Sequence, residues 1–116
     1  MVWLVTLDEL LLSQAQELRR GTTVLACLTL LEERQYGYAL LETLNDAGIP
    51  VEGNTLYPLL RRLEKQGLLV SEWETDDTRP RKFYQVTPQG ALARAGLTRE
   101  WQTLVGSISQ LTKEKR

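Results

Sequence analysis

The sequence predicts a mainly helical α+β fold, and three observations support this prediction. Apolar residues recur at helical spacing in four successive segments before residue 67. Two short segments, residues 68–74 and 82–86, are predicted strands joined by a polar tip. Thr87 and Pro88 then mark a helix start, with threonine as N-cap and proline as the first helical residue. This order of elements is typical of a winged helix-turn-helix with additional N-terminal and C-terminal helices.

Length and composition fit one domain. The chain has 116 residues, and a hydrophobic fraction of 42% is enough for a single core. We expect an N-terminal helix over residues 1–20 that supports a dimer. A winged helix-turn-helix over residues 21–87 and a C-terminal dimerisation helix over residues 88–116 should follow.

Residue usage excludes several classes of function. The absence of histidine and the single cysteine, Cys27, exclude histidine acid–base catalysis and an intrachain disulfide, and argue against structural zinc. Cys27 lies in the most apolar predicted helix, where a thiol is usually inert packing. No glycine-rich phosphate loop occurs, so we expect neither an enzyme nor a cofactor. The longest nearly apolar run, residues 24–31, is too short for a bilayer, so a soluble, cytoplasmic protein is expected.

Two helices are predicted before the helix-turn-helix. The first should begin at an Asp8 cap and run to about residue 20. The second, over residues 24–33 with Thr22 or Thr23 as its cap, is apolar almost all round and should be buried on most sides.

A third helix over residues 36–47 should end at Gly48, a residue suited to a left-handed C-terminal cap. A tight turn then leads to a fourth helix whose N-cap is Asn54 or Thr55. Pro58 is expected within the first turn, where its missing N–H costs little. Two helices joined in this way predict a helix-turn-helix, whose second helix would enter a DNA major groove.

The outer face of the fourth helix presents mostly hydrogen-bond donors. Its residues are Asn54, Tyr57, Pro58, Arg61 and Lys65, with Arg62 on the flank. Arginine can read guanine, asparagine can read adenine, and lysine or arginine can neutralise phosphates. The same pattern also fits a plain solvated helix face, and charge alone does not separate the two interpretations.

The polar tip between the predicted strands is basic on one side. Arg79, Arg81 and Lys82 lie close together, although Asp76 and Asp77 partly offset their charge. The chain carries 14 Lys and Arg against 15 Asp and Glu, so DNA binding requires a local basic face. Taken alone the tip fits a solubilising hairpin, but both basic surfaces would lie on one side, which favours duplex DNA.

Three stretches carry a resemblance to a known family: YGYAL at 36–40, TLYPLLRRLEKQGL at 55–68 and RPRKFYQVTPQG at 79–90. They resemble the PadR-like transcriptional regulators of the small type, which have a single C-terminal helix. The resemblance implies a winged-helix homodimer that represses transcription and often releases DNA on binding a small molecule. It implies DNA contacts for Tyr38, Thr55, Tyr57, Arg61, Arg79 and Lys82. The full predicted DNA-contacting set is Tyr38, Asn54, Thr55, Tyr57, Arg61, Arg62, Lys65, Arg79, Arg81 and Lys82.

The last predicted helix carries an apolar stripe with heptad-like spacing. The predicted dimer interface comprises Leu11, Leu18, Leu97, Trp101, Leu104, Ile108 and Leu111. A second subunit is the natural cover for the stripe, and folding back against the helix over residues 8–20 is the alternative. We expect both, with the first and last helices packed together and also across the two-fold axis. Near a dimer axis, Trp101 would offer a flat apolar surface to a small aromatic effector, with ordinary interface packing as the alternative.

Symmetry predicts the partner. Two recognition helices of a dimer should enter successive major grooves of a palindromic operator on double-stranded DNA. The alternative function is a winged-helix module that binds another protein and not DNA, which the acidic balance of the chain favours slightly.

Overall fold

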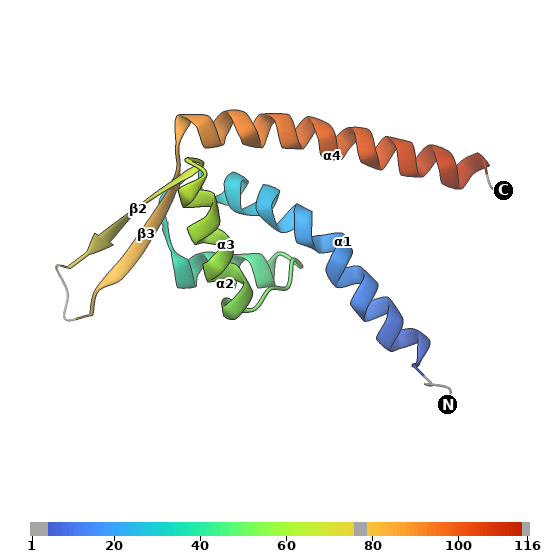
Figure 1. Cartoon of the computed structure of the whole chain (residues 1–116), viewed down its shortest axis with the longest axis horizontal. Coiled ribbons are helices and arrows are strands. Elements are labelled where there is room, and N and C mark those ends of the chain that lie inside the picture. Colours follow the sequence, from blue (N-terminus) through green and yellow to red (C-terminus); the bar gives the residue numbers. More distant parts are fainter. Residues whose placement is uncertain (1–4, 76–78, 115–116) are drawn as a thin grey trace.

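The computed structural model describes residues 5–75 and 79–114 (Figure 1). Within these residues the chain forms α1 (Leu7–Leu30), β1 (Gln35–Tyr36), α2 (Gly37–Asp46), α3 (Gly53–Lys65), β2 (Leu69–Glu74), β3 (Arg81–Val86) and α4 (Pro88–Glu114). The predicted mainly helical α+β fold is confirmed. The hairpin of β2 and β3, called the wing below, projects from one side of the helices (Figure 1).

The first helix is continuous, so the prediction of two separate helices is wrong. α1 spans 24 residues, and Thr6 caps it two residues before the predicted cap. Gly21 lies inside the helix, and its cost of about 1 kcal/mol relative to alanine does not break it. The hydroxyls of Thr22 and Thr23 both donate to the carbonyl of Arg19, at 2.8 and 3.0 Å. The two threonines therefore bond back along the helix instead of capping a new one.

The turn between α2 and α3 is fixed at both ends. Gly48 has φ +85°, and the N–H of Ile49 donates to the carbonyl of Leu44 at 2.9 Å, as in a Schellman cap. The side chain of Asn45 then bonds both the N–H and the carbonyl of Val51, at 3.3 and 3.0 Å. These contacts confirm the predicted tight, glycine-containing turn.

α3 begins earlier than the sequence indicated. Its N-cap is Glu52, whose carbonyl accepts from the N–H groups of Thr55 and Leu56. Pro58 consequently lies in the second turn and not in the first, so the carbonyl of Asn54 receives no N–H from the residue four positions on. The helix tolerates this loss because four leucines bury its inner face: Leu56, Leu59, Leu60 and Leu63.

The sheet has three antiparallel strands in the order β1-β3-β2. β2 and β3 match the predicted strands to within one residue, whereas β1 was not predicted. In β1, Tyr36 pairs with Phe83, and their rings stack with centroids 4.0 Å apart. This two-residue strand attaches the start of α2 directly to the wing.

The start of α4 packs closely on the end of the helix-turn-helix. Gly90 donates its N–H to the hydroxyl of Thr87 at 3.0 Å, which confirms Thr87 as the cap. A Cβ on Gly90 would lie 2.1 Å from the carbonyl oxygen of Leu68, so glycine is required at this position.

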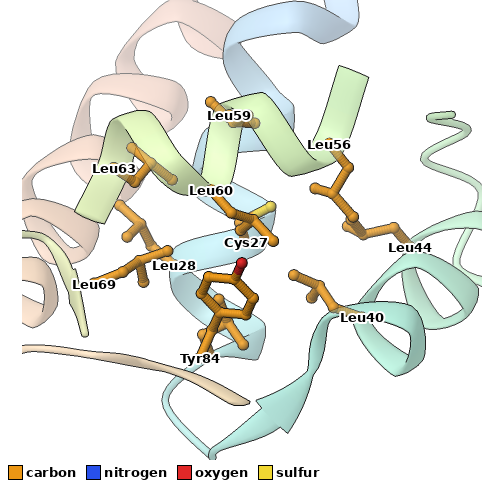
Figure 2. Close-up of a cluster of buried hydrophobic side chains, with 11 residues drawn as sticks. Cys27, Leu28, Leu40, Leu44, Leu56, Leu59, Leu60, Leu63, Leu69 and Tyr84 are labelled. Atoms are coloured by element: carbon orange, nitrogen blue, oxygen red, sulfur yellow. The ribbon is translucent and has the colours of Figure 1, made fainter. Parts of the chain in front are cut away.

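One leucine-rich core joins α1, α2, α3 and the sheet (Figure 2). Its buried members are Cys27, Leu28, Leu31, Leu40, Leu44, Leu56, Leu59, Leu60, Leu63, Leu69 and Tyr84. Cys27 is fully buried, and burial raises the pKa of its thiol to about 12. The thiol is therefore protonated at neutral pH and acts as packing, as predicted.

Two helical segments extend away from this core and diverge from each other (Figure 1). We call residues 7–20 of α1 and 97–114 of α4 the arms, and residues 21–96 the body. Nearly every arm residue is exposed in the single chain, including Leu18 (79%), Leu104 (60%) and Ile108 (62%). α1 and α4 contact each other, as expected, but most of the apolar stripe of α4 remains exposed in the single chain. Among the described residues, no helix is long and apolar enough to cross a membrane.

Candidate nucleic-acid interface

An open hollow of about 520 Å³ lies between the wing and the helix-turn-helix. Its lining consists of Gly37, Tyr38, Tyr57, Arg61, Trp73, Arg79, Pro80, Arg81, Lys82 and Tyr84. Four of these side chains are cationic, and no carboxylate is among the described residues that line the hollow. The structure thus brings together six of the residues predicted to contact DNA: Tyr38, Tyr57, Arg61, Arg79, Arg81 and Lys82.

The other predicted DNA-contacting residues lie outside this hollow. Asn54, Thr55, Arg62 and Lys65 are exposed on α3. Asp76 and Asp77, which were predicted to offset the charge of the wing, fall outside the described residues.

Two glycines hold the ring of Tyr57 in place. A Cβ on Gly37 would lie 2.9 Å from one edge carbon of the ring, and a Cβ on Gly53 would lie 3.2 Å from the opposite edge. The ring is therefore half-buried between the start of α2 and the start of α3. Tyr38 is more open, with 47% of its surface exposed, and its ring stacks on Tyr36 at 5.4 Å.

The basic residues of the wing divide between its two faces. On adjacent strands, Arg81 is paired with Glu74, and Lys82 is paired with Trp73. Paired residues share a face, and consecutive residues alternate between faces. Arg81 therefore lies on the same face as Glu74, and Lys82 on the opposite face with Trp73.

Lys82 forms an ion pair with α3. Its Nζ lies 3.8 Å from Oε1 of Glu64 on α3, and Glu64 also accepts a hydrogen bond from the hydroxyl of Ser71 on β2. The ammonium lies 5.4 Å from the centre of the Tyr84 ring and 5.7 Å from that of Trp73. Glu64 thus connects α3 to both strands of the wing.

Arg81 sits in a more tightly bonded cluster. Its Nη2 donates to Oε1 of Glu74 at 3.1 Å, and its guanidinium lies 4.4 Å from the centre of the Tyr36 ring. The hydroxyl of Tyr36 donates to the same oxygen of Glu74 at 2.7 Å, and this bond raises the pKa of Tyr36. A hydrogen bond to Tyr38 raises the pKa of Arg81, so the guanidinium stays charged.

The sequence did not identify several residues of this region. Trp73 is 63% exposed and lines the hollow. Gly37, which has no Cβ, leaves the space into which the Tyr57 ring packs. Glu64 and Glu74 bond the cations of the wing. Strand alternation could have placed Trp73 beside Lys82 and Glu74 beside Arg81 once the register was known, but no local pattern indicates Glu64.

Comparison with known proteins agrees with this architecture. Residues 24–95 match the transcriptional regulator PadR-like family. A crystal structure of a PadR-family transcriptional regulator from Eggerthella lenta is 47% identical, with 90% of this chain and 93% of that chain covered and a TM-score of 0.86. A PadR-like transcription factor from Bacteroides fragilis is 31% identical, covering 85% and 98% of the two chains with a TM-score of 0.71.

A curated relative covers a shorter segment. A transcriptional regulator of Mycobacterium tuberculosis is 45% identical over 69 residues, which are 60% of this chain and 62% of that protein. The chain thus matches less than two thirds of the length of this relative.

The family match extends over more than half of the chain and includes α2, α3 and the wing. The chain therefore belongs to the PadR-like family of transcriptional regulators, and this is a family of regulators and not of enzymes.

Proposed function

We propose that the protein binds double-stranded DNA in a sequence-specific manner through the hollow between α3 and the wing. The observation that carries this proposal is the convergence of four cationic side chains there: Arg61, Arg79, Arg81 and Lys82. Cations that neutralise phosphates gain affinity by releasing counterions from the duplex. With a formal net charge of -1, the chain would attract DNA through this local cluster and not through its overall charge.

In this proposal α3 is the recognition helix. Its N-terminal residues Asn54 and Thr55 are exposed, as a helix that enters the major groove requires. Arg61 would reach base edges or phosphates, and the more distant Arg62 and Lys65 would contact the backbone. The wing would lie along the adjacent phosphates with Arg79, Arg81 and Lys82.

The exposed arms support a homodimer as the active form. A stripe of large apolar side chains remains exposed on α4: Leu97, Trp101, Leu104, Ile108 and Leu111. Leu11 and Leu18 are exposed on the arm of α1. A two-fold contact between arms would place two recognition helices about one helical turn apart on a palindromic operator.

Repression relieved by a small aromatic effector is the regulatory outcome that we propose. Trp101 is 48% exposed within the α4 stripe. In a dimer this indole would offer the flat apolar surface that an aromatic ligand requires. Binding there would change the spacing of the two recognition helices.

The test is fluorescence anisotropy with a labelled duplex from the protein's own promoter region and a scrambled duplex, across a salt series. We expect the promoter duplex to bind more tightly, and affinity to fall as salt rises. Arg61→Ala and Lys82→Ala should each weaken binding about tenfold. Arg20→Ala is the matched control, because this arginine lies outside the hollow on α1 and its side chain is 77% exposed.

Equal, weak binding to both duplexes that is indifferent to these substitutions would contradict the proposal. That result would favour the alternative function, a winged-helix module that binds another protein.

A further inference from the structure

A carboxylate lies beside one of the proposed DNA-contacting cations. Glu74 belongs to β2, yet its Oε1 accepts from Arg81 on β3 at 3.1 Å and from the Tyr36 hydroxyl on β1 at 2.7 Å. Because the strand order is β1-β3-β2, Glu74 reaches across β3 and bonds both other strands. A negative charge next to a phosphate-binding cation would by itself weaken DNA binding, so its presence here requires an explanation.

Resting on the proposed function, we propose that Glu74 is a positioning residue that orients the Arg81 guanidinium toward a DNA phosphate. The guanidinium is held by the Glu74 carboxylate at 3.1 Å and lies over the Tyr36 ring at 4.4 Å from its centre. A guanidinium has five N–H donors, so it can bond a carboxylate and a phosphate together. Its rotamer is thereby fixed before DNA arrives, which lowers the entropic cost of binding.

The exposure of the pair agrees with this role. The side chains of Arg81 and Glu74 are 29% and 28% exposed, so both are largely shielded from solvent. They bond each other at the edge of the hollow. Glu72 provides a contrast on the same strand and the same face. Its side chain is 73% exposed, and its ion pair with Arg34 is longer, at 3.7 Å. Neither glutamate lines the hollow. Of the two, it is Glu74 that contacts a cation lining the hollow, Arg81.

The experiment compares Glu74→Gln with Glu72→Gln on the promoter duplex at several salt concentrations. Both variants remove one negative charge from β2, so charge alone would tighten binding in both, and more strongly for Glu74→Gln, whose carboxylate lies beside a cation of the hollow. We expect Glu72→Gln to bind within about twofold of the unaltered protein. Glu74→Gln should bind about fivefold more weakly, and the slope of log affinity against log salt should fall by up to about one, as for a lost phosphate contact.

A double-mutant cycle tests whether Glu74 acts through Arg81. Arg81→Ala should weaken binding about tenfold. Adding Glu74→Gln to Arg81→Ala should cause no further loss, whereas the loss would multiply if the residues were independent. Tyr36→Phe, which keeps the stacked ring and removes the hydroxyl, should cause a smaller loss of the same kind.

The outcomes separate this inference from the proposed function. If the unaltered protein shows no salt-dependent preference for the duplex, the proposed function fails and this inference fails with it. If the unaltered protein binds but Glu74→Gln binds as tightly as Glu72→Gln or more tightly, or if its effect multiplies with Arg81→Ala, the inference alone is overturned.

Discussion

The body and the arms bury their leucines to opposite extents, and α1 shows the contrast within one helix. Leu28 is fully buried in the core, whereas Leu11 and Leu18 on the same helix are 64% and 79% exposed. Hydrophobicity is the same at all three positions, so burial depends on whether another element covers the helix. Among the described residues, covering elements surround the body and not the arms. The chain thus carries more apolar surface than one copy buries, as expected for a subunit of a dimer.

The largest effect should come from a cavity in the body. Leu60 is fully buried, so Leu60→Ala should lower the free energy of unfolding by about 2–5 kcal/mol. Leu92→Ala is the control, because Leu92 is 75% exposed and its loss should cost no more than about 0.5 kcal/mol. Urea denaturation followed by circular dichroism measures both values. Equal losses would show that the body is not the separately packed unit described above.

The arms should respond through association and not through folding. Replacing both Leu104 and Ile108 by Asp should raise the dimer dissociation constant by at least about 100-fold, because burying unpaired carboxylates is unfavourable. Sedimentation velocity over a concentration series measures the change, with Leu92→Asp as the control outside the stripe. A dimer that survives the double substitution would place the interface elsewhere. The circular dichroism spectrum of the double variant should stay helical, which would show that the body remains folded.

The pH dependence of stability offers a smaller effect that is specific to the body. The thiol of Cys27 has its pKa raised from 9.0 to about 12 by burial. Above pH 9 the unfolded chain releases this proton and the folded chain does not, so rising pH favours unfolding. Stability should fall by about 1.4 kcal/mol per pH unit between these two pKa values and show no such contribution below pH 9. Denaturation at pH 9 and pH 10.5, with Cys27→Ala to subtract other titrating groups, measures the slope. The same slope in the variant would refute the assignment to Cys27.

The smallest predicted effect on stability comes from adding a methyl group at a glycine in the arm of α4, where the space around the Cβ position is open in the single chain. A Cβ on Gly106 would meet nothing within 4 Å in the single chain. Gly106→Ala should therefore stabilise the protein by up to about 1 kcal/mol through helix propensity. Gly90→Ala in the body should act in the opposite direction, because its Cβ would lie 2.1 Å from the Leu68 carbonyl oxygen. If thermal melts instead show Gly106→Ala to be destabilising, a second copy must approach the helix closely at that position.

The parts of the fold with local signals could be predicted from the sequence. Gly48 ends α2 and Thr87 caps α4, as their residue types and spacing indicated. The continuity of α1 could not be predicted, because Gly21 and the two threonines after it resemble a break. Only the structure shows the threonine hydroxyls bonded to the carbonyl of Arg19.

The candidate site also has a part that could be predicted from the sequence and a part that could not. The cations that line the hollow could be predicted from residue types and helical or strand spacing. The contact between Glu74 and the Tyr36 hydroxyl could not, because these two residues lie 38 positions apart in the chain. That contact depends on β1, and a strand of two residues has no periodicity by which to recognise it.

The unbroken α1 also has a mechanical consequence. Its 24 residues form a rod about 36 Å long, which reaches from the arm to the core beside α3. A tilt of about 10° at the buried end displaces the far end by about 6 Å. Cys27 and Leu28 lie near the buried end of this helix, and the exposed leucines lie near its other end. The helix can therefore act as a lever between the two. A force applied to the arms would be transmitted by this one helix to the packing beneath α3.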